Sequence, residues 1–221
     1  GVYRAIKRSG MIDTLRAQGI DVLYYCQVDN PLVFMSDPTF VGHHLLADAQ
    51  MSVKVVEKTE AGEKVGLVVE NNGKVQCIEY SDISAELQAQ TADDGGLLYR
   101  AGNIAVHVYA INFFEEMAEA HLPLHLAHKT IKALAPGESI PSDVEGVKFE
   151  TFVFDALPLA DRVVVQLADR EYEFAPVKNR PGSDSAATSR AALSARAKQW
   201  LPTIDGSCDY SDQQIELSSS V

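Results

Sequence analysis

Cysteine is scarce in this chain of 221 residues. Its three cysteines, Cys26, Cys77 and Cys208, are widely spaced, odd in number and never in a CxxC pair. This pattern argues against a disulfide framework and against a cysteine-rich zinc site. A reducing, cytoplasmic compartment is therefore the expected location.

Long hydrophobic runs and excess positive charge are also absent. No apolar run approaches the ~20 residues of a membrane helix, and the first residues, Gly1 to Arg4, do not resemble a signal peptide. With 31 acidic and 19 basic residues the net charge is −12, which predicts repulsion from nucleic acid and anionic lipid. An anionic small molecule would need a few placed Lys, Arg or backbone N–H groups, or a metal ion. No feature fixes an oligomeric state.

The run from Ile20 to Val28 is almost entirely apolar and ends abruptly in Asp29-Asn30-Pro31. Such a run is typical of a buried strand of an α/β sheet whose chain emerges at the carboxyl edge. Ligands of open α/β sheets bind at that edge, so Asp29 is placed to meet a metal ion or a hydroxyl. The alternative is that these three residues form only a turn.

The remaining periodicity predicts an α/β domain over residues 1–204, followed by a polar tail over 205–221. Helices are expected at 9–19, from Asp37-Pro38 onward, and at 184–201; strands are expected at 53–58, 101–109 and 162–167. Asn71-Asn72-Gly73 between two β-rich runs predicts a hairpin. Gly66, inside the first of those runs, indicates a bulge or a close approach to the backbone. Residues 122–148 give a mixed pattern, broken by three prolines.

Seven short segments occur in one order and spacing: Val28-Asp29-Asn30; Lys54-Val55-Val56-Glu57-Lys58; Val65-Gly66; Glu79-Tyr80-Ser81; Ala101-Gly102-Asn103-Ile104-Ala105 with His107; Phe152-Val153-Phe154-Asp155; and Pro176-Val177-Lys178-Asn179. Together they resemble the eukaryotic-type UDP-N-acetylglucosamine pyrophosphorylases of the wider UDP-sugar pyrophosphorylase family. The resemblance extends from residue 1 to about residue 200.

The resemblance implies a nucleotidyltransferase fold, Rossmann-like, with a mixed, mainly parallel sheet and helices on both faces. It implies that N-acetylglucosamine 1-phosphate attacks the α-phosphorus of UTP and that pyrophosphate leaves. By resemblance, Asp29 holds Mg²⁺, which needs few protein carboxylates when phosphate oxygens also bind it. Lys178 corresponds to the residue that steadies the phosphate under attack.

On the sugar side, the resemblance implies that Gly66 lets the sugar lie against the backbone and that Glu79, beside Tyr80, accepts sugar hydroxyl groups. Asn103 is suited to reading hydroxyl or acetamido groups. Phe152 and Phe154 correspond to an aromatic wall around the N-acetyl group. Each has a plainer alternative: Glu79 as a solvated strand residue, the two phenylalanines as core, Lys178 as a loop lysine.

Two departures from the family pattern concern the ends of the chain. The glycine-rich loop G-G-x-G-T-R is absent, and Gly1-Val2-Tyr3-Arg4 resembles the end of the next motif, which places Gly1 among the expected substrate-binding residues. At the other end, Ile215-Glu216-Leu217-Ser218 resembles the start of the family's C-terminal segment, and the chain then stops. We therefore expect a fragment that lacks the N-terminal nucleotide-loop segment and the C-terminal segment and is catalytically silent alone. Two other interpretations stay open, a pyrophosphorylase for glucose 1-phosphate or several sugars, and a non-catalytic sugar-nucleotide-binding relative.

Overall fold

The computed structural model describes residues 1–134, 136–137, 139–204 and 213–215, so most of the expected tail lies outside the described residues. Within them, six strands form one sheet in the order β4-β3-β5-β2-β8, with β1 also paired to β5. The strands are β1 (Val22–Tyr25), β2 (Met51–Glu57), β3 (Leu67–Asn71), β4 (Lys74–Ile78), β5 (Ala101–Ala110) and β8 (Val163–Leu167).

The sheet is mixed, as predicted. Both β1 and β2 pair antiparallel with β5, and β2 pairs parallel with β8. Strands β1, β2 and β8 therefore run in the same direction and end at one edge. Because β5 runs the opposite way between β1 and β2, the β2–β8 pair is the one parallel pairing among the described strands. The expected parallel character thus lies in the shared direction of β1, β2 and β8 rather than in most of the pairings.

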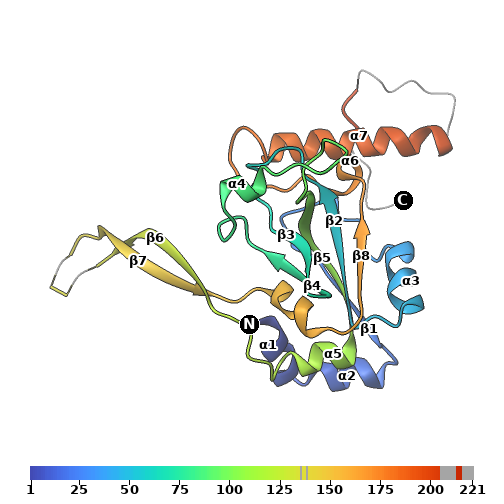
Figure 1. Cartoon of the computed structure of the whole chain (residues 1–221), viewed down its shortest axis with the longest axis horizontal. Helices are drawn as coiled ribbons and strands as arrows, with labels where there is room; N and C mark the ends of the chain where they lie inside the picture. Colours follow the sequence, from blue (N-terminus) through green and yellow to red (C-terminus); the bar gives the residue numbers. More distant parts are fainter. Residues whose placement is uncertain (135, 138, 205–212, 216–221) are drawn as a thin grey trace.

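Helices cover both faces of the sheet, which confirms the predicted α/β class. On one face, Tyr3, Ile12 and Phe113 bring α1 (Val2–Arg8), α2 (Met11–Ala17) and α5 (Ile111–Glu116) into a core with Val53 and Tyr109. On the other face, Phe40 brings α3 (Pro38–Leu46) against Val106 and Val108. Helix α7 (Ala186–Ile204) lies across one end of the sheet (Figure 1).

Local sequence signals explain several of these elements. Asp37 caps α3 by accepting a hydrogen bond from the Thr39 N–H at 2.9 Å, with Pro38 at the first helical position. The predicted hairpin of β3 and β4 turns at Asn72 and Gly73. Both residues have positive φ (51° and 75°), as the two central residues of a type I′ turn require. The predictions for these two elements and for α7 are confirmed.

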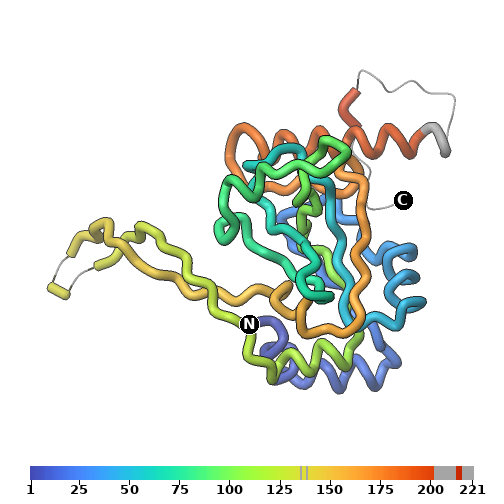
Figure 2. The backbone as a smooth tube through the Cα atoms, viewed as in Figure 1, coloured from blue at the N-terminus to red at the C-terminus, as the bar shows by residue number. Residues whose placement is uncertain are grey.

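Other segments differ from the expectation. Strand β1 ends at Tyr25, and Val28 is fully exposed in the turn that holds Asp29, so the apolar run is only partly a strand. Residues 122–148 contribute most of an antiparallel hairpin, β6 (His125–Ala133) and β7 (Ser142–Glu150), that projects from the body (Figure 2). The sequence did not predict this hairpin. Side chains on both of its faces are largely exposed, so its strands do not need the alternation of apolar and polar residues by which strands are recognised.

The remaining described helices are short: α4 (Ala85–Gln88), α6 (Arg170–Glu173) and the 3₁₀ helix η1 (Val153–Leu159). No helix within the described ranges has the length and hydrophobicity needed to span a membrane. A separate groove of about 450 Å³ runs along α7, lined largely by apolar side chains such as Leu193 and Trp200.

Candidate functional site

A cleft of about 140 Å³ lies at the edge where β1 and β2 end. Its walls come from the turn after β1, the loop before β3, the residues just after β4, the first half of β5, η1 and the segment after α6. The lining residues are Gln27, Asp29, Asn30, Lys64, Val65, Gly66, Glu79, Tyr80, Asn103, Ile104, Ala105, Phe154, Phe174, Pro176 and Lys178.

Most of the residues singled out in the sequence meet in this cleft, although their roles stay predictions. They are Asp29, Gly66, Glu79, Tyr80, Asn103, Phe154 and Lys178. Phe152 lies one layer behind, stacked on Phe154 at 4.8 Å between ring centroids and 14° between planes. Gly1 lies elsewhere: it lines a separate cavity with Tyr3 and His121.

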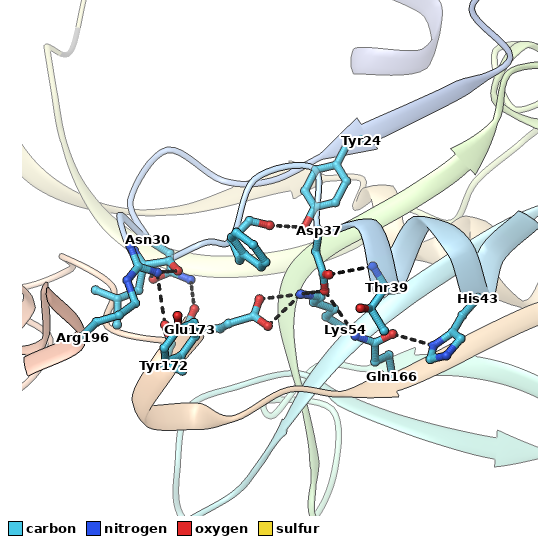
Figure 3. Close-up of polar contacts among 12 residues, drawn as sticks. Tyr24, Asn30, Asp37, Thr39, His43, Lys54, Gln166, Tyr172, Glu173 and Arg196 are labelled. Atoms are coloured by element: carbon cyan, nitrogen blue, oxygen red, sulfur yellow. Dashed lines mark hydrogen bonds and ion pairs between the residues drawn. The ribbon is translucent and has the colours of Figure 1, made fainter. Parts of the chain in front are cut away.

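Two hydrogen-bonded loops carry Asp29 and Lys178. The Val177 N–H donates to the Asp29 carbonyl at 2.8 Å. The buried Asn30 side chain donates to the Glu173 carbonyl at 2.8 Å (Figure 3). Its side-chain oxygen accepts a hydrogen bond from the Ala175 N–H at 3.1 Å. These bonds fix the turn after β1 against the segment after α6. Among the described residues, the Asp29 carboxylate and the Lys178 ammonium form no ion pair and remain available to a ligand.

Behind these loops lies a buried ionic cluster that the sequence did not disclose. The Lys54 Nζ, with no exposed surface, lies 2.7 Å from Asp37 Oδ2 and 2.6 Å from Glu173 Oε2 (Figure 3). Burial raises the pKa of Asp37, but its hydrogen bond and charge interaction with Lys54 outweigh this and leave that pKa lowered. The Glu173 carbonyl also accepts the hydrogen bond from the Asn30 side-chain amide, so the cluster supports the loop that carries Asp29.

The close approach to Gly66 is made by the chain itself. A Cβ atom on Gly66 would lie 2.8 Å from Cys77 Sγ and 3.3 Å from Glu79 Oε1, both on or just after β4. The Gly66 carbonyl accepts a hydrogen bond from the Asn103 N–H at 2.7 Å. The glycine therefore has a packing reason, whether or not a ligand also lies against it.

The bulge lies in β5 instead. Pairing with β2 slips between Lys54 and Val55, and Ala105 has a φ of 56°. The Asn103 side-chain oxygen accepts a hydrogen bond from the Ala105 N–H at 2.9 Å and so stabilises this bulge. Its amide nitrogen lies 3.4 Å from Cys77 Sγ, a weak contact, so this nitrogen is the group of Asn103 that can serve a ligand.

Glu79 lies half-buried beside other acids. Burial, followed by the charge of Asp82, raises the pKa of Glu79, while His125 and Lys178 act in the opposite direction. His125 Nε2 lies 3.1 Å from both carboxylate oxygens of Asp155, and its ring packs on Phe152 at 4.8 Å. This arrangement supports the two stacked phenylalanines from behind.

Three features of the cleft escaped the sequence reasoning. Lys64 and Gln27 are flexible polar residues beside a glycine and a turn, a pattern common on any surface. The backbone at residues 104–105 enters the cleft only because of the bulge, whose local signal was an Asn two positions before an Ala. None of these signals was specific enough to identify a site.

The donor set of the cleft is compatible with Mg²⁺. The described residues contain no group of three or more His, Cys, Asp or Glu side chains that could hold a metal ion. Mg²⁺ commonly takes one or two carboxylates and completes its octahedron with phosphate oxygens and water. Asp29, a half-buried carboxylate with no ion-pair partner in the described part of the chain, fits that requirement.

Comparisons with known proteins agree with the family resemblance found in the sequence. Residues 1–197 match the model of the family described as UTP–glucose-1-phosphate uridylyltransferase. The UDP-N-acetylglucosamine pyrophosphorylase of Saccharomyces cerevisiae is 37% identical over 232 residues, covering 100% of this chain and 48% of the relative. The mouse UDP-N-acetylhexosamine pyrophosphorylase-like protein 1 is 36% identical, covering 90% of this chain and 41% of the relative. The chain thus spans less than half of the length of these curated relatives.

Solved structures show the same fold. A putative UDP-N-acetylglucosamine pyrophosphorylase from Entamoeba histolytica superposes with a TM-score of 0.85 at 27% identity, covering 99% of this chain and 55% of that one. The corresponding enzyme of Trypanosoma brucei, solved with an inhibitor, gives a TM-score of 0.79 at 27% identity, covering 92% and 40%.

Proposed function

The chain belongs to the UTP–glucose-1-phosphate uridylyltransferase family, and on that premise we propose that it forms the sugar-binding part of a UTP-dependent sugar-1-phosphate uridylyltransferase. The proposed products are UDP-N-acetylglucosamine and pyrophosphate, made from UTP and N-acetylglucosamine 1-phosphate. The observation that supports this most is the meeting of Asp29, Lys178, Glu79, Asn103 and Phe154 from separate segments in one cleft.

In this reaction an oxygen of the sugar phosphate forms a bond to the α-phosphorus of UTP, and the bond from that phosphorus to the β-phosphate oxygen breaks. Such transfers depend on alignment and on neutralising charge more than on covalent help from the protein. Asp29 would hold Mg²⁺, which when bound neutralises phosphate charge. The Lys178 ammonium would stabilise the charge that grows at the α-phosphate.

The other side of the cleft suits a sugar. Glu79 would accept hydrogen bonds from hydroxyl groups, with Tyr80 exposed at the rim. The Asn103 amide nitrogen would donate to an oxygen of the sugar or of its acetamido group. Phe154, stacked on Phe152, would offer an apolar surface to the N-acetyl methyl group.

A second candidate is transfer to glucose 1-phosphate, because the description of the matching family names that sugar phosphate. A third is a non-catalytic relative. We propose a cytoplasmic location, in keeping with the small number of cysteines in the sequence and with the proposed substrates.

Pyrophosphate release tests the proposal. The assay uses the protein from the longest open reading frame that contains these 221 residues, with UTP, Mg²⁺ and a panel of sugar 1-phosphates. We expect turnover highest with N-acetylglucosamine 1-phosphate. Lys178→Met should lower kcat more than it raises KM, because the charge that Lys178 meets develops toward the transition state. Absence of turnover with every sugar phosphate would contradict the enzymatic function.

A further inference from the structure

Lys64 is a positively charged residue of the cleft that belongs to none of the segments carrying the family resemblance. Of the cleft-lining residues, Lys64 and Lys178 are the two cations, and neither forms an ion pair with a described residue. Several other lysines in the described part of the chain do form ion pairs, among them Lys7 with Glu115, Lys74 with Asp161 and Lys148 with Glu150.

The loop that carries Lys64 is held in place on both sides of it. On its N-terminal side, Glu63 forms an ion pair with Arg170, which also donates to the Glu57 carbonyl at 3.0 Å. The Lys58 Nζ, nearly buried, donates to the Ala61 carbonyl at 2.9 Å. On its C-terminal side, the Gly66 carbonyl is bound by the Asn103 N–H.

Arg170 also joins this loop to the segment that carries Lys178. Arg170 is the first residue of α6, and its guanidinium lies 5.2 Å from the centre of the Phe174 ring. Phe174 and Pro176, which lie between Arg170 and Lys178 in the sequence, line the cleft. The two lysines therefore reach one cleft from two chain segments that Arg170 ties together.

The charges of the cleft indicate what two cations would bind there. Asp29 and Glu79 line the same cleft, and the whole chain carries a net charge of −12, so an anionic ligand meets repulsion on entry. One ammonium supplies half of the charge that a phosphate monoester dianion carries, and the charge of Mg²⁺ at Asp29 would be divided between that carboxylate and the phosphates of UTP. Two lysines on different segments supply compact charges without requiring a fixed bidentate geometry.

We propose that Lys64 is a substrate-binding residue that contacts the phosphate group of the sugar 1-phosphate. This inference rests on the proposed function. The sugar phosphate loses negative charge as its oxygen bonds to the α-phosphorus, so the contact with Lys64 is strongest before the reaction. Lys64 therefore contributes to binding of the sugar phosphate and not to the chemical step, in contrast to Lys178.

The test compares three variants of the protein from the longest open reading frame. In Lys64→Ala, KM for N-acetylglucosamine 1-phosphate should rise about tenfold, the usual effect of one charge-assisted contact, with kcat and KM for UTP unchanged. Lys64→Arg should keep most of the affinity. Lys74→Ala is the matched control and should behave like wild type, because Lys74 lies outside the cleft and pairs with the exposed Asp161 at 2.9 Å. An unchanged KM in Lys64→Ala, or a fall in kcat alone, would overturn the inference.

A binding measurement separates this inference from the proposed function. If the wild-type protein released no pyrophosphate, the enzymatic proposal would fall, and the 221-residue chain would be titrated calorimetrically with N-acetylglucosamine 1-phosphate. Binding by wild type that weakens in Lys64→Ala would support the role of Lys64. Equal affinity in both proteins, or no binding by wild type, would refute it.

Discussion

Replacing Lys54 by Met is the most informative test of how the site is supported. Met keeps the length of the apolar stem and removes the ammonium that lies 2.7 Å from Asp37 and 2.6 Å from Glu173. Both carboxylates are themselves buried, so each would keep its desolvation cost and lose its counter-charge. The ionic cluster joins α3, β2 and α6, so the substitution should weaken the packing of these three elements. It should also weaken the hydrogen bond from Asn30 to Glu173.

The expected loss of stability is about 3–5 kcal/mol at pH 7, the usual cost of removing one partner of a buried ion pair. That is a large share of the ~5–15 kcal/mol that holds a typical domain folded. The loss should depend on pH. The pKa of Asp37 is lowered in the folded protein, so its pairing stabilises the fold above the ordinary carboxylate pKa and ceases to do so as the pH falls through the lowered value. The difference between wild type and Lys54→Met should therefore narrow in acid.

Urea unfolding of the 221-residue chain, followed by circular dichroism at pH 7 and in acid, measures both effects. Lys74→Met is the matched control, because its pair with Asp161 lies in solvent, where screening leaves an ion pair little effect on stability. Asp37→Asn combined with Glu173→Gln and Lys54→Met removes all three charges and should recover much of the stability. Equal free energies of unfolding for Lys54→Met and Lys74→Met would refute the reasoning.

Three further predictions concern single positions. Gly66→Ala should lower the melting temperature, because the new Cβ would lie 2.8 Å from Cys77 Sγ, and Cys77→Ala in the same protein should restore part of it; no recovery would mean that another contact is limiting. Phe154→Ala should weaken the preference for N-acetylglucosamine 1-phosphate over glucose 1-phosphate by ~1–3 kcal/mol in kcat/KM, whereas an equal loss on both sugars would assign this residue to the core. Burial lowers the pKa of His107 to about 3, so the unfolded chain takes up a proton first and stability falls as the pH drops from ~6.5 toward 3. In that range His107→Leu should flatten the free energy of unfolding against pH, while the exposed His128→Leu should not; equal slopes would contradict a neutral buried imidazole.

The parts of the fold that depend on local chemistry could be predicted from the sequence. Asp37 followed by Pro38 begins a helix wherever it stands, and Asn72-Gly73 has the backbone freedom that a tight hairpin turn needs. The apolar run before Asp29 was also a local signal for the edge of the sheet. In the structure Asp29 lies in a turn, and that turn is at the edge of the sheet, so both interpretations of this segment hold.

Features that depend on distant partners could not be predicted. Lys54 stands among valines of a strand, where a lysine is ordinarily placed on a solvent-exposed face. Its partners follow from tertiary packing, since Asp37 caps a helix before the strand and Glu173 lies 119 residues after Lys54. Lys64 has no local pattern of its own, and it enters the cleft because Arg170 holds the neighbouring Glu63.

The central claim is that the cleft at the edge of β1 and β2 binds the sugar phosphate beside a metal ion. The most direct test is a crystal structure of the protein from the longest open reading frame, grown with UDP-N-acetylglucosamine and Mn²⁺ in place of Mg²⁺. We predict an anomalous Mn²⁺ peak next to the Asp29 carboxylate, the diphosphate between Lys64 and Lys178, and the acetamido methyl group against Phe154. A well-ordered ligand bound outside this cleft would contradict the account.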